Sequence, residues 1–179
     1  MNRIILIPLT LTFALAQSSA ARADDTRDAV VVSLSGFESV PTFEELAGRH
    51  GIAPLTARLV SIAEDTTKPV FVRSRAVNLL GKSGQAEAVP MLDRLLRGPG
   101  ESFVVTRAAL QAAGNQRGAL VRRVGMHLDS EDVHLREIAI KSLVKIGGAE
   151  SYRLLRSRQS KERSPMLAKE LERVLAVPR

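Results

Sequence analysis

The sequence has no cysteine, no tryptophan and a single tyrosine, and aromatic residues make up only 3% of the chain. Without cysteine there can be no disulfides, so the folded chain must be stabilised by its apolar core. The scarcity of aromatic rings removes the platforms on which single-stranded nucleic acids stack their bases. Leucine, valine and alanine dominate instead, which is typical of helices packed on helices.

Common catalytic and ligand-binding motifs are also missing. The stretch Gly81-Lys82-Ser83 hints at a phosphate loop, but the first glycine of that motif would fall on Ala76, and a helical pattern precedes it. We therefore interpret this stretch as the end of a helix. The three histidines, His50, His127 and His134, lack the spacing of metal ligands, and no G-x-S-x-G elbow occurs. The sequence predicts neither a metal site nor a cofactor.

The first 23 residues have the layout of a secretory signal peptide. Arg3 precedes an apolar run from Ile4 to Ala16, which is followed by small residues and an A-x-A site at 21–23. The run is shorter than the roughly 20 residues that a membrane-spanning helix needs, and no cysteine follows it to carry a lipid. We expect cleavage before Asp24, a periplasmic or secreted location, and no membrane span in the mature chain.

An internal repeat of about 30 residues runs through the rest of the chain. Its first copy begins V-R-x-x-A-V-x-L-L-G at Val72, and related copies begin at Val105 and Leu135. The small residue in each copy, at positions 76, 109 and 139, lets neighbouring helices approach closely. We expect Gly81 and Gly84 to end the first helix and Pro90 to lie in the first turn of the second.

Each copy is interpreted as two short helices joined by a turn. The expected pairs are 42–50 with 54–64, 70–81 with 86–97, 102–113 with 118–128, and 132–145 with 149–158, before a last helix at 163–176. Thr42 and Glu45 predict a capping box, and Pro54 should open its second helix. For residues 24–41 a short strand and an extended lead-in both fit, and we favour an ordered, irregular segment packed on the first pair.

The pattern resembles the HEAT-repeat family in its short bacterial form, also seen in phycobilisome-lyase-like repeats. The segments 72–96 (VRSRAVNLLGKSGQAEAVPMLDRLL) and 128–151 (LDSEDVHLREIAIKSLVKIGGAES) carry the resemblance, which covers 70–158 and extends weakly to 43 and 175. It implies an all-α, right-handed α-solenoid of about four helix pairs plus a C-terminal capping helix, spanning residues 42–179. The middle copy departs from the family at Thr106, where arginine is favoured, and at Arg117, where glycine is favoured.

The resemblance also implies roles for particular residues. Arg73 and Arg136 stand at the family's arginine position and should stack one repeat on the next, with Asp129 pairing with Arg136. The second helices should line a concave face that binds partners. The candidate partner surface is therefore the set of arginines on the second helices: Arg94, Arg97, Arg122, Arg123, Arg153 and Arg156. His127 matches Leu95 in the repeat, so we expect it to be half-buried.

Charge is distributed unevenly, with a net −5 over residues 24–65 and +5 over each of 66–150 and 151–179. A solvated basic face is the common meaning of such runs, and binding of an anionic partner is the functional one. We expect a non-catalytic protein-interaction module or scaffold with an acidic protein partner and no nucleic acid. Head-to-tail self-association competes with that prediction. The alternative is an enzyme or enzyme accessory of the HEAT-like lyase or nucleic-acid-binding type, which a deep pocket of converging polar groups would favour.

Overall fold

The computed structural model describes residues 28–36, 39–98 and 100–176. All regular structure in these ranges is helical, as predicted, and they contain no strand. The expected signal peptide at 1–23 and its cleavage site lie outside the described residues.

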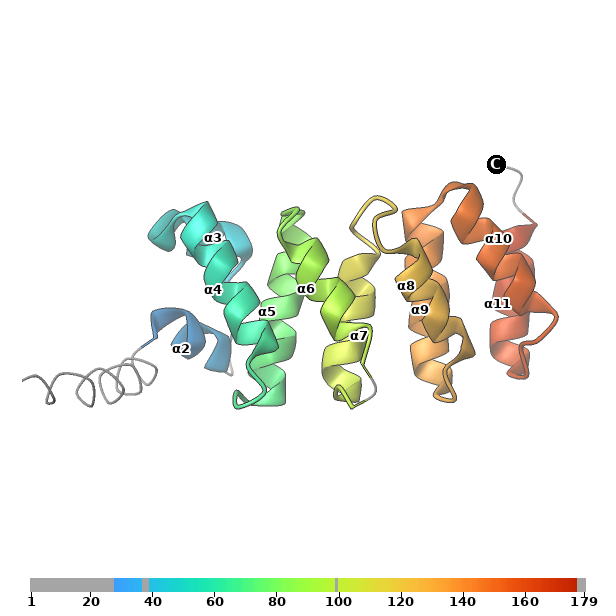
Figure 1. The fold of residues 1–179 in the computed structure, drawn as a ribbon, viewed down its shortest axis with the longest axis horizontal. Coiled ribbons are helices and arrows are strands. Elements are labelled where there is room, and N and C mark those ends of the chain that lie inside the picture. Colours follow the sequence, from blue (N-terminus) through green and yellow to red (C-terminus); the bar gives the residue numbers. More distant parts are fainter. Residues whose placement is uncertain (1–27, 37–38, 99, 177–179) are drawn as a thin grey trace, which may run out of the picture.

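The helices follow one another as pairs along one axis (Figure 1). The pairs are α3 (Phe43–His50) with α4 (Ile52–Glu64), α5 (Val70–Ser83) with α6 (Ala88–Leu95), α7 (Phe103–Ala113) with α8 (Val121–Met126), and α9 (Val133–Ile146) with α10 (Gly148–Gln159). A 3-10 turn, η1 (His127–Asp129), continues α8. Helix α11 (Pro165–Leu175) closes the C-terminal end, and α2 (Ala29–Ser35) precedes the first pair. The expected ranges are therefore correct to within a few residues.

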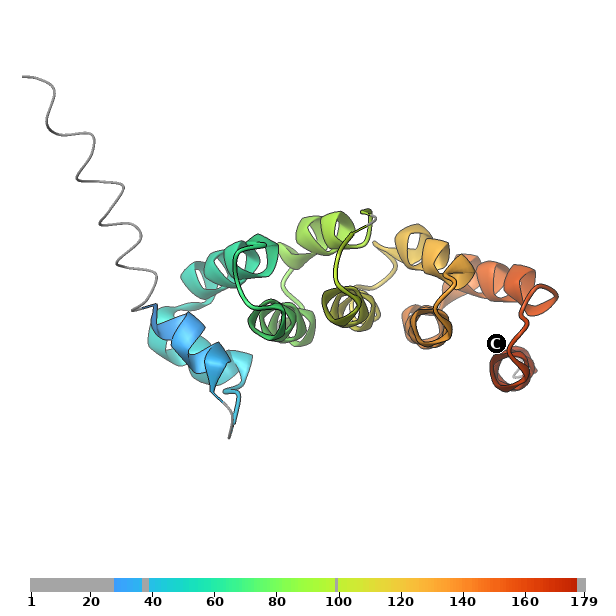
Figure 2. The same cartoon turned by 90° about the horizontal axis from the view of Figure 1, so that it is seen from below.

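The pairs build two layers, and both layers are bowed (Figure 2). The second helices α4, α6, α8 and α10 form the layer on the outer, convex side of the bow. The first helices α5, α7, α9 and α11 form the layer on the inner, concave side. The expectation that the second helices line the concave face is therefore wrong. Below, "outer face" means the exposed side of α4, α6, α8 and α10, and "inner face" means the exposed side of α5, α7, α9 and α11.

Local sequence signals set several helix ends as predicted. The Thr42 hydroxyl accepts from the Glu45 N–H at 3.2 Å while the Glu45 carboxylate accepts from the Thr42 N–H at 2.8 Å, which completes the capping box. Pro90 lies in the first turn of α6, and Pro54 lies in the first turn of α4, which begins two residues earlier than expected. Gly84 ends α5 in the left-handed region, with φ 68° and ψ 13°.

Gly81 does not end the helix, contrary to expectation. It lies inside α5 and is buried, and a Cβ built on it would stand 2.4 Å from the Cβ of Ala112 in α7. Glycine is required at this position because the two helices approach too closely for any side chain. The repeated small residues Ala76, Ala109 and Ala139 are fully buried, which confirms their role in close packing.

Residues 29–35 form helix α2, so neither a strand nor an irregular segment is correct for them. The Asp28 carboxylate caps this helix by accepting from the Val30 N–H at 2.9 Å, and it also pairs with Arg58 of α4. Val30 and Leu34 are buried in the common core. One guanidinium nitrogen of Arg75 donates to the Leu34 carbonyl at 2.6 Å. The predicted packing on the first pair is confirmed through α4, and α2 contacts α5 as well.

Candidate functional site

Arg73 ties consecutive repeats together. Its side chain is buried in α5, where Nε donates to the Ala63 carbonyl at 3.0 Å. Its two terminal nitrogens donate to the Glu101 carboxylate at 2.9 and 2.6 Å, the two-point geometry that makes such pairs strong. Glu101 immediately precedes Ser102, the N-cap of α7. The guanidinium therefore fixes the start of the next repeat, and the expected structural role is confirmed.

Arg136 repeats this arrangement at the end of the array. It donates to both carboxylate oxygens of Glu162, at 3.1 and 3.0 Å, and to the carbonyls of Ser130 and Glu131. Glu162 lies two residues before Ser164, the N-cap of α11. The expected pairing of Arg136 with Asp129 is wrong, because Asp129 accepts from Arg158 at 2.9 Å instead. The partner comes from the following repeat, not from the preceding turn.

Glu162 is the most strongly perturbed acid in this arrangement. Its side chain has no exposed surface, and burial alone would raise its pKa. Hydrogen bonds from Arg136, from the Ser164 N–H and from Arg158 outweigh that effect and lower the pKa of Glu162 to about 2. The carboxylate therefore stays charged over the physiological pH range and holds two arginines at once.

Two open clefts lie at equivalent places in the array. One, of about 940 Å³, is lined by residues that include Arg136, Arg158 and Glu162, and another, of about 600 Å³, contains Arg73, Arg94, Glu101 and Glu64. A deep pocket of converging polar groups is the feature that would favour the alternative function, an enzyme. Here the same kind of charge arrangement recurs at two junctions, where Arg73 bonds to Glu101 and Arg136 and Arg158 bond to Glu162. The repeat-stacking role accounts for these ion pairs.

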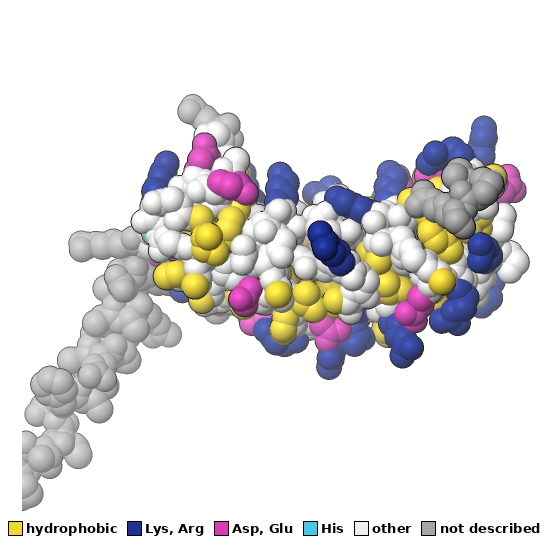
Figure 3. Space-filling model, turned by 90° about the horizontal axis from the view of Figure 1, so that it is seen from above, with side chains coloured by type: hydrophobic (Ala, Val, Ile, Leu, Met, Phe, Trp, Pro, Cys, Tyr) yellow, Lys and Arg dark blue, Asp and Glu magenta, His cyan; other side chains and the backbone are white. Residues whose placement is uncertain are grey.

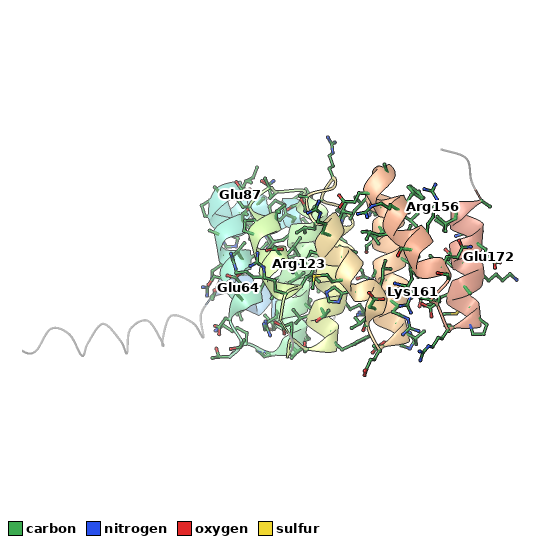
Figure 4. All side chains as sticks on the ribbon, turned by 45° about the vertical axis from the view of Figure 1, so that its right-hand side comes forward. Glu64, Glu87, Arg123, Arg156, Lys161 and Glu172 are labelled. Atoms are coloured by element: carbon green, nitrogen blue, oxygen red, sulfur yellow. The ribbon has the colours of Figure 1, made fainter. Side chains whose placement is uncertain are left out.

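The six predicted surface arginines lie on the second helices or directly after one, and most of them contact acids. Arg94 pairs with Glu64 at 2.5 Å, and Arg123 pairs with Asp93 at 2.8 Å. Each of these pairs joins consecutive second helices. Figure 4 shows Glu64, Arg123 and Arg156 in order from the α4 end to the α10 end of the molecule.

The other outer arginines follow the same rule, with one exception. Asp93 also pairs with Arg97, and Glu150 accepts from Arg122 at 3.0 Å and lies 3.7 Å from Arg153. Arg156 is the one member of the set with no acid partner among the described residues. The structure therefore brings the six together on one side, but three of them pair with acids of neighbouring repeats and two with acids of their own repeat. Charge counting along the sequence missed this because the inter-repeat partners are 28 to 30 residues apart.

The inner face carries a second set of exposed side chains that the sequence interpretation did not single out. Each first helix projects residues at helical spacing away from the second layer, with an apolar or histidine side chain in the first turn and cations further along. By helix, they are Phe71, Arg75 and Lys82 on α5; Phe103, Arg107 and Gln111 on α7; His134, Lys141 and Lys145 on α9; and Met166, Lys169 and Arg173 on α11.

Several inner-face cations have no acid partner within the described ranges, namely Lys82, Arg107, Lys145 and Lys169. Two acids on this face are already engaged, because Glu137 pairs with Lys141 at 2.5 Å and Glu170 pairs with Arg173 at 2.6 Å. Figure 3 shows the contrast: along the convex lower side Asp and Glu are interspersed with Lys and Arg, while on the hollowed upper side basic side chains prevail between the two ends.

His127 and the potential metal ligands are the remaining candidates. His127 is half-buried as expected, with Nε2 3.2 Å from the Leu96 carbonyl, and burial lowers its pKa. No group of three or more potential metal ligands gathers within the described part of the chain. None of the described helices is both long and apolar enough to cross a bilayer.

The comparisons with known proteins do not assign the chain to a family. No protein-family model matches the chain, and no curated protein is similar enough to count as a relative.

Proposed function

We propose that this chain is a non-catalytic protein-interaction module of the bacterial envelope or secreted space. In this proposal the array is a HEAT-like right-handed solenoid, and the partner binds on its concave side. The observation that carries the proposal is the inner face itself. Four successive first helices present exposed side chains on the same side of the array, and several of their cations have no acid partner among the described residues.

The distribution of ion pairs favours the inner face over the outer arginines. A partner that recruits Arg94 or Arg123 must first displace Glu64 or Asp93, both of which already accept from those guanidiniums. Each exposed pair is worth only roughly 0–1 kcal/mol, but several must be broken together. Arg107 and Lys145 need no such exchange, so their charge is available to an acidic partner.

A matched pair of charge-reversal variants tests this function. Arg107→Glu with Lys145→Glu changes the inner face, and Arg156→Glu with Lys161→Glu applies the same change of charge elsewhere. All four side chains are exposed and lack acid partners in the described ranges, so neither variant breaks an ion pair. Circular dichroism checks that both variants fold. After chemical cross-linking of the envelope fraction, we expect the inner variant to lose the proteins that wild type recovers and the other variant to keep them.

The opposite pattern would place the partner near the predicted arginines Arg153 and Arg156, and unchanged recovery by both variants would contradict an electrostatic binding face. Recovery of the chain's own copies alone would identify self-association.

The proposed location has its own test. N-terminal sequencing of the exported protein should begin at Asp24, because the A-x-A site ends at residue 23. A protein that retains Met1 and sediments with membranes would contradict this location.

A further inference from the structure

The lower edge of the inner face carries an apolar patch. Val70 and Phe71 at the start of α5 and Phe103 and Val104 at the start of α7 are 37 to 44% exposed. Helices α5 and α7 lie side by side in both ribbon views (Figures 1 and 2), and all four residues belong to the first turns of these two helices. Exposed apolar groups gathered on a protein surface are a feature of interaction sites.

Aromatic residues make this patch stand out. The other described aromatic side chains, Phe43 and Tyr152, are buried, whereas Phe71 and Phe103 are about two-fifths exposed in the patch. The Phe71 ring is also held in place, because the Arg75 guanidinium lies 5.4 Å from its centroid. Arg75 is anchored in turn by hydrogen bonds to the Leu34 and Gly36 carbonyls. A fixed aromatic ring loses little entropy when a partner covers it.

The unpaired cations begin one turn beyond this patch. Arg107 follows Phe103 by four residues, which places its Cα about 6 Å further along α7. Lys82 and Lys145 lie in the last turns of α5 and α9. The inner face is therefore apolar along the first turns of α5 and α7, with His134 at the corresponding end of α9. It is cationic from the middle of α7 to the last turns of α5 and α9.

We propose that the inner face binds an acidic, amphipathic protein segment that crosses α5, α7 and α9. The apolar side of the segment covers Phe71 and Phe103, and its carboxylates face Arg107, Lys82 and Lys145. This inference rests on the proposed function and adds the chemical class of the partner.

The shape and chemistry of the face favour a protein segment over other anionic partners. A flat bilayer would meet the raised ends of the bow before it reached Arg107 and Lys145 between them. A phosphate backbone would be attracted to the cations, but it would leave the phenylalanine edge uncovered. A narrow segment with one acidic and one apolar side can contact the cations and the phenylalanine edge at the same time.

The test is a titration of the mature chain with three labelled probes, followed by fluorescence anisotropy. The first is a synthetic helical peptide of about five turns with leucines on one side and glutamates on the other. The second has the same composition in shuffled order, and the third is polyglutamate of equal length. We expect the amphipathic peptide to bind at least about tenfold more tightly than either of the other probes. A difference of about tenfold is what one buried aromatic anchor contributes to affinity.

Three double variants locate the binding. Phe71→Ser with Phe103→Ser and Arg107→Glu with Lys145→Glu should each weaken binding at least about tenfold. Arg156→Glu with Lys161→Glu should leave binding within about twofold, because those side chains lie away from the inner face. The substituted side chains are exposed, and circular dichroism checks that each variant folds.

Equal binding of all three probes, or no effect of the phenylalanine substitutions, would overturn the proposal in favour of a simple polyanion site. Binding to phosphatidylglycerol vesicles without binding to the peptide would point to a membrane surface and also overturn it. If the peptide fails while envelope proteins still cross-link through the inner face, the partner class is wrong and the proposed function stands. If cross-linking fails as well, both are wrong.

Discussion

Single residues hold consecutive repeats in register, and Glu162 is the clearest case. Its buried carboxylate accepts from Arg136 and Arg158, which belong to different helices of the preceding pair, and it precedes the cap of α11. The sequence marked both arginine positions, Arg73 and Arg136, but not their partners. The partner acids lie 26 to 28 residues further on, and only the stacking of repeats brings them within reach.

Glu162 should contribute to a dependence of stability on pH. Its folded pKa of about 2 lies below its ordinary value of 4.5. The stabilisation is therefore fully present above about pH 4.5 and is lost as the pH falls towards 2. We expect Glu162→Gln to lower the free energy of unfolding at neutral pH by a few kcal/mol, because buried Arg136 loses its acid and Arg158 keeps only Asp129. The variant should also flatten the change in stability between pH 4.5 and 2.

Urea unfolding at several pH values measures this effect. Glu172→Gln, on the exposed side of α11, is the control and should follow wild type. An unchanged acid slope in Glu162→Gln would contradict the assigned role.

Gly81 offers a second test at the same scale. Gly81→Ala should destabilise the fold by about 1–3 kcal/mol, the usual cost of overpacking, because its Cβ would collide with Ala112. Gly48→Ala in α3 meets no atom within 4 Å, so it should be neutral or stabilise by up to about 1 kcal/mol through helix propensity. Thermal unfolding of both variants checks the contrast, and a neutral Gly81→Ala would mean that α5 and α7 are further apart.

At the scale of elements, periodic apolar residues located nine of the helices, and caps set several of their ends. Helix α2 escaped prediction because its residues, AVVVSLS, include three valines in a row, which favour a strand locally. Tertiary contacts override that preference. Asp28 caps the helix, and Val30 and Leu34 are buried when α2 packs against α4 and α5.

Asp28→Ala should release α2 from the first pairs. The change removes the N-cap, worth about 1 kcal/mol, and the pair with Arg58. Hydrogen–deuterium exchange over residues 29–35 should speed up, while exchange in α9 stays as in wild type. Asp28→Asn keeps the capping oxygen and should show a smaller change. Protection of 29–35 equal to wild type in Asp28→Ala would show that apolar docking alone holds the helix.

At the scale of the whole molecule, the junctions between repeats are unequal. Arginine ties the α5 repeat to the next one and the α9 repeat to the capping helix, but the middle repeat has Thr106 at the same place. Its junction contains instead a hydrogen bond from the Ser142 hydroxyl to the Leu110 carbonyl at 2.8 Å. The sequence foresaw this departure at Thr106, because the repeat alignment shows it directly.

Substitution at the three equivalent positions should reveal this difference. Arg73→Met and Arg136→Met should each cost about 3–5 kcal/mol, because Glu101 loses its arginine and buried Glu162 keeps only Arg158. Thr106→Val should cost about 1 kcal/mol or less, since no charge is left unpaired. Urea unfolding measures the loss of unfolding free energy in all three variants. Equal losses would show that the junctions do not differ in this way.

The curvature of the array and the pairing of its charges could not be predicted from the sequence. The basic residues could be counted by segment, but their pairing depends on which helices lie side by side. Arg94, Arg122 and Arg123 on the outer face contact acids of neighbouring helices. Arg107 and Lys145 on the inner face have no acid partner among the described residues. The side of the bow that each layer occupies depends on small rotations summed over several repeats, which no single motif encodes.

The central claim, that the inner face is the partner surface, is tested most directly by site-specific photo-cross-linking in intact cells. A photoreactive side chain replaces Gln111 on the inner face in one variant and Ser157 on α10 in another, both at exposed positions. The account predicts that the Gln111 variant forms a discrete cross-linked product with a second protein and that the Ser157 variant does not. A product from Ser157 alone would contradict the claim and return the binding site to the outer arginines.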